Sequence, residues 1–483
     1  MTSDRELMEL AYDYIFALSK KKSFNPQTLA NYNYFRSNGK RNVIERMKLP
    51  IEQFLRENEP SKVKDFVYKS DYFTPRNMFL INPIYYVYYT YLVFKISHLY
   101  LDKNKYEIKL DFSKERISAF YSGTLFFNRS LEEIDENAMF NKSYSMFQKE
   151  RKLYFGNPVL KIDIQNFFSN IKIEALLNKL RKLIGNKRII DDLQTFFNHC
   201  NIDSLPQLHY SIASSILSQF YLHEFDSKIH STLERENLFL IRFVDDMYII
   251  HLSGVGEIKT NNNILNEISY FLWEDALALN TSKTKMLSAE EYEIDYEITD
   301  SEYEDGSTSF STEILIDEKS TEIIEDGSFI TFIEKLCDLE KSNGIDLYEY
   351  KNLINEYLSI KGEDSNKVLK NIIFSKKWRS MSRDDLIKLV GNWKYLLFNP
   401  TEFTILYVLV YRYLERKGDI QDGGLKIKRI LNYLFTNNIF TFRDTLVAVS
   451  YLFQSSFKNK ELIKKIDSVN PEYVLFVENY IIN

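Results

Sequence analysis

The chain has 483 residues, 45% of them hydrophobic, with few glycines and prolines. This length allows two or three domains, and the composition favours a globular, helix-rich protein over a disordered chain. Its two cysteines, Cys200 and Cys337, give no disulfide framework and no zinc spacing, so we expect a reducing, intracellular setting. The net charge is −6, but Glu290 to Asp326 holds fifteen acidic residues and one lysine, so the remainder is net positive.

Residues 1 to about 150 have a mostly helical pattern. The first 22 residues are amphipathic and differ from a signal peptide. Basic and aromatic residues are interleaved between Tyr32 and Lys48; this stretch either holds phosphates and stacks bases or forms a solvated basic face over an aromatic core. The run from Ile81 to Ile96 is short and rich in tyrosine, which favours a buried helix, and we expect no membrane partner.

A predicted strand follows Asn157-Pro158, within the sequence VLKIDIQNFFSNI. Hydrophobic residues alternate along it, which is the period of a strand with two different faces. Asp163 emerges near the end of the strand, on the face opposite the leucine and isoleucines. A lone aspartate at such a position caps the following turn, or it works with other carboxylates further along the chain.

The segment from Leu205 to Ile229 starts as a loop with several small residues and continues as a predicted helix with one apolar side. Small residues at the start of a helix allow a ligand to approach closely. A tightly packed core helix gives the same pattern, so both interpretations remain open at this point.

Two apolar runs in LFLIRFVDDMYIIHL, residues 238–252, flank the adjacent carboxylates Asp245 and Asp246. Each run suits a buried strand, so the pair is predicted at the tip of a β-hairpin. Asp-Asp is a poor turn compared with Asn-Gly or Asp-Gly, and it places two like charges together. A divalent cation such as Mg²⁺ would neutralise them, whereas a solvated acidic turn is the alternative.

A helix is expected from Asn262 to Ala276, followed by LALNTSKTKML at residues 277–287. Lys283 in this element could donate to a leaving pyrophosphate, or it is simply a surface lysine. The acidic segment at residues 288–327 alternates aromatic or aliphatic residues with acidic ones, and we expect exposed strands or a partly disordered insertion there.

From Thr331 the pattern is purely helical, which predicts stacked helix pairs of an α-solenoid, HEAT-like kind. The candidate helices are Leu347–Leu358, Asp384–Leu397, Glu402–Arg416, Leu425–Leu434, Arg443–Phe453 and Glu472–Ile482. The predicted domains are residues 1–150, 151–330 with the acidic insertion at 288–327, and 331–483. The predicted fold class is α+β, with an antiparallel sheet and helices followed by an all-α domain.

Three of these elements, in this order, resemble the palm of a reverse transcriptase over roughly residues 155–290. The residues from Asp163 to Phe168 resemble the first palm motif, and Phe243 to Asp246 the Tyr/Phe-x-Asp-Asp motif. Leu279-Asn280 through Lys283-Thr284 resembles the Leu-Asn-x-x-Lys-Thr element that follows. The resemblance implies fingers and a palm, two-metal phosphoryl transfer from a dNTP, and Mg²⁺ as cofactor, with Mn²⁺ as a possible substitute.

The same resemblance assigns roles to individual residues. Asp163 and Asp245 would bridge two metal ions, with assistance from Asp246. Phe168 falls where the family places a ring under the sugar, so that dNTPs are favoured over NTPs. The other expected nucleotide-binding residues are Ile164 through its backbone, Gln207 and Lys283.

The loop before the helix departs from the family, because Pro206-Gln207 is followed by Leu208 where the family normally has glycine. Such a palm, joined to a helical domain instead of a standard thumb, resembles bacterial abortive-infection polymerases and other defence-associated reverse transcriptases. That resemblance implies antiphage defence in the bacterial cytoplasm, homo-oligomers and untemplated DNA synthesis primed by a tyrosine, which leaves single-stranded DNA attached to that residue.

Two alternatives stay open: a reverse transcriptase that copies a non-coding RNA, and a non-catalytic nucleic-acid-binding scaffold. The intact set of three aspartates argues against the scaffold. The priming tyrosine cannot be assigned, because the chain has 34 tyrosines and no motif distinguishes one of them.

Overall fold

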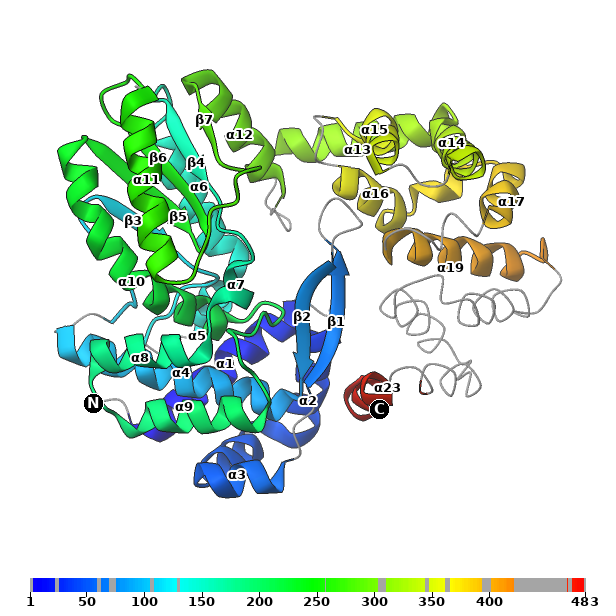
Figure 1. The fold of residues 1–483 in the computed structure, drawn as a ribbon. Coiled ribbons are helices and arrows are strands. Elements are labelled where there is room, and N and C mark those ends of the chain that lie inside the picture. Colours follow the sequence, from blue (N-terminus) through cyan, green and yellow to red (C-terminus); the bar gives the residue numbers. More distant parts are fainter. Residues whose placement is uncertain are drawn as a thin grey trace.

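The computed structural model describes residues 3–21, 26–58, 62–68, 75–104, 108–127, 131–256, 258–302, 310–343, 347–360, 365–392, 401–420, 467 and 471–481. Three groups of elements can be followed in Figure 1: N-terminal helices with a two-stranded hairpin, an α/β unit around a five-stranded sheet, and C-terminal helices. The α+β class predicted from the sequence is confirmed.

The five-stranded sheet forms the centre of the α/β unit. Its strands are β3 (Ile117–Phe120), β4 (Val159–Ile162), β5 (Leu238–Phe243), β6 (Asp246–His251) and β7 (Lys285–Leu287). They lie in the order β3-β5-β6-β4-β7, and every neighbouring pair is antiparallel except β3 with β5. The sequence pattern does not predict the edge strand β3, because four residues are too few to establish a period.

Helices cover both faces of this sheet, namely α6 (Phe140–Lys152), α10 (Ile212–Arg235), α11 (Ile258–Glu274) and α12 (Ala289–Glu302). On one face, Arg242 of β5 forms a buried ion pair with Asp226 of α10, and α11 packs beside α10. On the other face, Tyr248 of β6 donates a hydrogen bond to Asp295 of α12, which packs beside α6. The sheet is therefore buried on both sides, as its almost continuous apolar strands require.

The N-terminal group is mostly helical, as predicted, but it also contains a hairpin that the helical pattern does not show. Its elements are α1 (Asp4–Lys21), α2 (Pro26–Met47), α3 (Ile51–Glu57), β1 (Lys62–Tyr68), β2 (Pro75–Ile81), α4 (Pro83–Asn104) and α5 (Leu131–Asn137). Two helices from later in the chain, α8 (Ile173–Ile184) and α9 (Arg188–His199), pack against α4. Helix α4 contains most of the run from Ile81 to Ile96, and the tyrosines of this run are buried, which confirms the expected buried helix. In the described part of the chain, no helix is long and apolar enough to cross a membrane.

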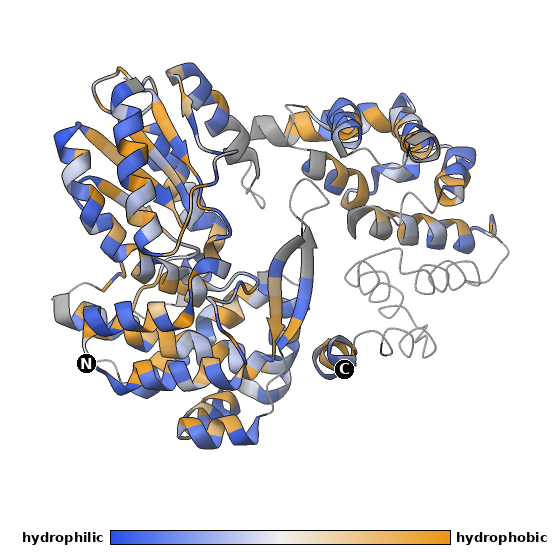
Figure 2. Ribbon diagram, in the orientation of Figure 1, coloured by the Kyte–Doolittle hydropathy of each residue, from blue (hydrophilic) through white to orange (hydrophobic). Residues whose placement is uncertain are grey.

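Beyond residue 327 the described residues form helices and no strand, as expected. These helices are α14 (Ser328–Asn343), α15 (Leu347–Leu358), α16 (Ser365–Phe374), the short 3₁₀ helix η1 (Lys377–Ser380), α17 (Arg383–Gly391), α19 (Thr401–Arg416) and α23 (Pro471–Tyr480). Their buried side chains form a second hydrophobic core, separate from that of the sheet, and Figure 2 shows the two-sided hydropathy of the helices. The helices expected at 425–434 and 443–453 lie outside the described residues, and the HEAT-like repeat stays a prediction.

The acidic segment corrects the expectation of exposed strands. It contains α12 and a further helix, α13 (Phe310–Glu325), and only residues 303–309 between them lie outside the described part. The alternating pattern is misleading because the residues that α12 buries, Tyr292 and Asp295, are three apart, whereas Ile294 is 58% exposed. Helix α12 packs on the α/β unit and α13 packs on the C-terminal helices, so the segment joins the two parts instead of forming an insertion.

The last described helix, α23, returns to the N-terminal group. It packs against α2 and β1, and its buried residues share a core with Val63 of β1 and Leu80 of β2. The side-chain amide of Asn33 on α2 donates to the carbonyl oxygen of Tyr480 at 3.1 Å. The C-terminal end of the described chain therefore supports the β1–β2 hairpin, although more than 380 residues separate them in sequence.

We predict that Phe476→Ala, which empties a 1%-exposed position of α23, destabilises this contact by about 3–5 kcal/mol. Amide hydrogen exchange in β1 and β2 should accelerate, while exchange in β5 and β6 stays unchanged. Leu475→Ala is the matched control, because Leu475 is 55% exposed and its truncation should cost less than about 0.5 kcal/mol. Equal effects of the two variants on the hairpin would contradict this packing.

Candidate active site

The two aspartates of the β5–β6 hairpin lie at its tip, as predicted. Phe243 pairs with Asp246, so the turn itself consists only of Val244 and Asp245. Val244 adopts φ +56°, an unfavourable conformation for a β-branched residue. Its amide donates to the carbonyl oxygen of Phe120 at 3.0 Å, and its side chain is buried. The end of β3 thus holds a turn that the residues alone would not favour.

Asp163 lies beside this turn because of the register of the central strands. Ile162 pairs with Met247, so Asp163 follows β4 at the level where Asp246 begins β6. Two residues of the Leu-Asn-x-x-Lys element bind the 7%-exposed Asp163. The Asn280 amide nitrogen donates to Oδ1 at 2.7 Å, and the Lys283 ammonium lies 3.1 Å from Oδ2. The structure therefore brings together all three predicted aspartates and the predicted lysine.

The electrostatics of this cluster are unfavourable in the protein alone. Loss of hydration, together with repulsion from Asp246 and Asp163, raises the pKa of Asp245 to about 8. Loss of hydration and the Asp163 charge also raise the pKa of Asp246. Burial lowers the pKa of Lys283, but the Asp163 carboxylate outweighs it and the net shift is upward. One lysine does not neutralise three carboxylates.

This donor set fits a divalent cation. Carboxylate oxygens are the ligands that Mg²⁺ prefers, and a bound cation would relieve the repulsion that raises the pKa of Asp245. Within the described residues, the group whose three ligand atoms lie within 4.8 Å of one another is Glu115, His230 and Glu234, and the three aspartates do not meet this distance. His230 and Glu234 lie near the C-terminal end of α10, whereas the loop near the site precedes its N-terminal end, so this group is separate from the aspartates.

The expected nucleotide-binding residues after Asp163 have different environments. Ile164 is buried at 2% exposure, and the bridge between it and Leu279 uses the carbonyl of Asp163 and the amide of Gln165. The backbone groups of Ile164 are not part of these two hydrogen bonds. Phe168 lies on α7 (Phe167–Asn170), packs against the core and is only partly buried. Their contact with a nucleotide stays a prediction.

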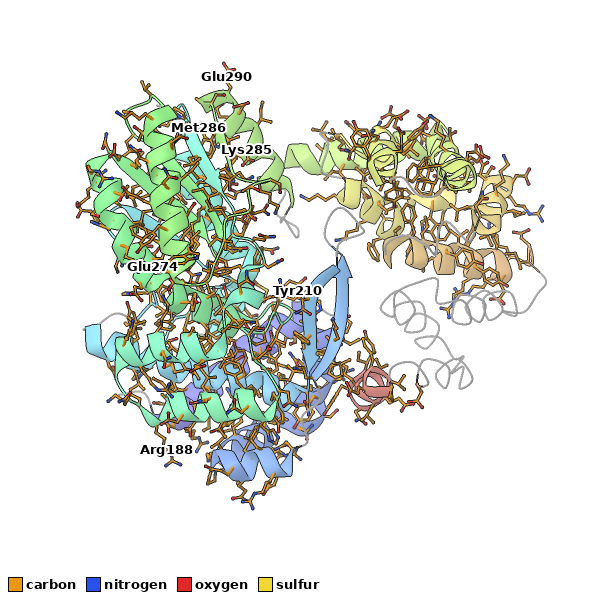
Figure 3. All side chains as sticks on the ribbon, viewed as in Figure 1. Arg188, Tyr210, Glu274, Lys285, Met286 and Glu290 are labelled. Atoms are coloured by element: carbon orange, nitrogen blue, oxygen red, sulfur yellow. The ribbon has the colours of Figure 1, made fainter. Side chains whose placement is uncertain are left out.

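Gln207 lies in the loop that leads to α10, on the side of β2, where Figure 3 labels the neighbouring Tyr210. Its carbonyl oxygen accepts a hydrogen bond from the amide of Phe79 at 3.1 Å. Leu208, at the family's glycine position, is only 6% exposed and contributes to the core. The small residues that follow are packed inside the fold: Ser211 caps α10, and the hydroxyl of Ser215 accepts from the amide of Ser122 at 2.8 Å. The start of α10 is therefore tightly packed, as the core-helix interpretation of this segment expects.

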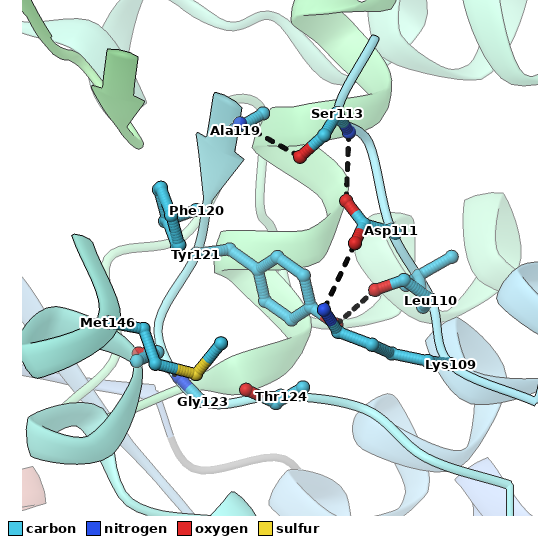
Figure 4. A pocket seen from close by; sticks show the side chains of 11 residues that line it. Lys109, Leu110, Asp111, Ser113, Ala119, Phe120, Tyr121, Gly123, Thr124 and Met146 are labelled. Atoms are coloured by element: carbon cyan, nitrogen blue, oxygen red, sulfur yellow. Dashed lines mark hydrogen bonds and ion pairs between the residues drawn. The ribbon is translucent and has the colours of Figure 1, made fainter. Parts of the chain in front are cut away.

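Sequence reasoning misses several residues that support the site. Phe120 holds the Val244 turn, but the four-residue strand that contains it gives no pattern. Lys161 binds Asp295 at 2.6 Å. The alternation of the strand could have identified it, since Lys161 and Asp163 lie on the same face. A small pocket beside β3 is lined by Lys109, Asp111 and the end of β3 at Phe120 (Figure 4). None of the three aspartates lines this pocket.

We predict that Asp245 makes the metal-free protein less stable as the pH rises. Its folded-state pKa of about 8 exceeds the ordinary value of about 4, so between these pH values the folded state keeps a proton that the unfolded state has lost. In EDTA, denaturant unfolding should show the free energy of unfolding falling more steeply from pH 5 to 8 in the wild type than in Asp245→Asn. The exposed Asp203→Asn is the control and should keep the wild-type slope. Identical slopes for wild type and Asp245→Asn would contradict the assignment.

Comparison with known proteins supports the same part of the chain. Residues 126–296 match the family model described as reverse transcriptase (RNA-dependent DNA polymerase). No curated protein matches the chain. Among solved structures, telomerase from Candida albicans in complex with a TWJ fragment of telomeric RNA aligns at 12% identity over 88% of this chain and 68% of that chain. The TM-score of this alignment is 0.30. The family match covers strands β4 to β7, the three aspartates and Lys283, so this protein contains a reverse transcriptase domain and is a nucleotidyltransferase.

Proposed function

We propose that the protein is a DNA polymerase whose active site consists of Asp163, Asp245 and Asp246. The observation that carries this proposal is the meeting of three aspartates at the adjoining ends of β4 and the β5–β6 hairpin, with their charge largely uncompensated. Holding like charges together is unfavourable unless a ligand neutralises them. The non-catalytic scaffold gains nothing from this arrangement.

Asp163 and Asp245 would hold two divalent cations, with Asp246 assisting, and Mg²⁺ is the proposed ion with Mn²⁺ as substitute. Bound there, the ions would neutralise charge on the triphosphate and orient it for attack. The remaining roles belong to the chain's own side chains. Lys283, which contacts Asp163, would donate to the leaving pyrophosphate, and the partly buried ring of Phe168 would exclude a ribose 2′-hydroxyl.

Ile164 and Gln207 complete the proposed nucleotide site. The backbone of Ile164 would face the triphosphate, and the side chain of Gln207, which is half-buried, would contact the incoming nucleotide. The substrates are dNTPs in this proposal.

The finer assignment is to antiphage defence of the abortive-infection type, with untemplated DNA synthesis from a tyrosine of the same chain. Two observations support it. Leu208 stands where template-copying relatives normally have glycine, and its side chain is buried in the core. The described residues that follow the palm are helical, unlike a standard thumb followed by an endonuclease domain. Homo-oligomers and a location in the bacterial cytoplasm belong to the same proposal.

Copying of a non-coding RNA is the second candidate. It is favoured by one finding, the match to a family model for RNA-dependent DNA polymerases. The two candidates differ in the primer and in the dependence on RNA, and both can be measured.

Replacement of Asp245 and Asp246 by asparagine tests the shared part of the proposal. The double variant should lose Mg²⁺-dependent incorporation of labelled dNTP by at least about 1,000-fold, because ligation is lost while repulsion is relieved. Its circular dichroism spectrum should remain that of the wild type. Asp203→Asn together with Ser204→Ala is a matched surface control and should retain full activity. Undiminished synthesis by the aspartate variant would eliminate the polymerase assignment.

The primer is tested by following the label. A hydroxyl must lie about 3 Å from the α-phosphate and in line with the leaving pyrophosphate, and a tyrosine hydroxyl can satisfy this geometry. In the abortive-infection candidate, labelled dNTP should stay with the protein band after boiling in detergent and ribonuclease treatment. Proteolysis should then yield a labelled peptide that contains tyrosine. Label that separates from the protein, combined with loss of activity after ribonuclease, would favour the RNA-copying candidate.

A further inference from the structure

The loop at Pro206–Tyr210 lacks the family's glycine, and the structure shows other contacts that fix it. The amide of Phe79 on β2 donates to the carbonyl oxygen of Gln207 at 3.1 Å. Nε2 of His209 lies 2.6 Å from Oδ2 of Asp65 on β1. The hydroxyl of Tyr86 on α4 donates to the carbonyl oxygen of His209 at 2.8 Å. Both strands of the β1–β2 hairpin therefore bind the loop.

The contact between His209 and Asp65 is shielded from solvent. The two side chains are 7% and 0% exposed, and they lie 144 positions apart in sequence. The second carboxylate oxygen of Asp65, Oδ1, is buried without a hydrogen-bond partner in the part of the chain that the structure describes. A buried carboxylate with so few donors depends strongly on each one it has. Loss of His209 would therefore disturb the loop more than loss of a surface contact.

Two hydrogen bonds connect the helix that follows the loop to the turn that carries Asp245. The loop leads directly into α10, where the hydroxyl of Ser215 binds the amide of Ser122. Two residues earlier, the carbonyl oxygen of Phe120 accepts the amide hydrogen of Val244, the residue before Asp245. A displacement of the loop would move Gln207, a residue of the proposed nucleotide site, whereas the strand pairing that positions the aspartates does not involve the loop.

We infer that His209 and Asp65 are positioning residues for nucleotide insertion: their buried contact fixes the loop at Gln207 and Leu208 against the β1–β2 hairpin. This inference rests on the proposed polymerase function. The hairpin has a firm base, because the side chain of Gln27 both donates to the carbonyl oxygen of Ile81 and accepts from its amide, each at 2.8 Å. The family normally has a glycine in this loop, whereas here the contact between His209 and Asp65 of the hairpin fixes its conformation.

The experiment compares steady-state dNTP incorporation by the full chain and its His209 variants. His209→Leu removes the donor, and the KM for dNTP should rise about tenfold while kcat changes less than about threefold. His209→Gln places an amide donor near the position of Nε2 and should restore most of the wild-type KM. His199→Leu, on the exposed end of α9, is the matched control and should leave both constants unchanged. Hydrogen exchange in residues 206–211 should accelerate in His209→Leu only.

The outcomes separate positioning from a merely structural role. A structural role would lower the active fraction, so His209→Leu and His209→Gln would lose kcat at unchanged KM, and that result overturns the inference. If His209→Leu does not fold, Asp65→Asn, which keeps an acceptor but removes the charge, should still raise KM. An unchanged KM in that variant also overturns the inference. Activity in the wild type that is lost in Asp245→Asn upholds the proposed function whatever the His209 variants show, whereas an inactive wild type overturns both.

Discussion

The repulsion among Asp163, Asp245 and Asp246 is the constraint around which the α/β unit is arranged. Like charges at adjoining strand ends would separate if the backbone could yield, and the register of β4, β5 and β6 prevents this. The turn between the strands is also constrained, because Val244 adopts a positive φ and is retained by β3. Rigid strands thus keep Asp245 and Asp246 in a place where loss of hydration and neighbouring carboxylates raise the pKa of both.

Positively charged side chains lie near the aspartates on the same face of the sheet. Tyr248 and Lys161 occupy this face and share Asp295 with the buried Arg151. The positive charges of Lys161 and Arg151 reach Asp246 and oppose the upward shift of its pKa. Asp295 in turn has a lowered pKa, since the favourable charges and hydrogen bonds outweigh its loss of hydration. The acidic segment therefore supplies a carboxylate that balances two cations beside the site, and its helical form is required for this contact.

The sequence predicts the strands of the site but few of the contacts that support it. Alternating or continuous apolar runs identify β4, β5 and β6 with their aspartates, because burial imposes those patterns locally. In contrast, β3 is too short to show a period, and α12 has an alternation that favours the wrong element. The contact between Asp65 and His209 joins residues 144 positions apart. Such a contact depends on how the hairpin and the loop pack, and no local pattern encodes that arrangement.

The contacts around the β1–β2 hairpin connect the far end of the chain to the site. Helix α23 packs on β1 and α2, Gln27 of α2 binds Ile81 at the base of the hairpin, and β1 and β2 bind the loop before α10. Each link is a packed or hydrogen-bonded contact between ordered elements, so displacement of α23 would alter the support of the loop more than that of the central strands. The palm strands carry their aspartates without this chain of contacts. The C-terminal helix therefore supports the hairpin that binds this loop, whereas the pairing of β4, β5 and β6 holds the carboxylates.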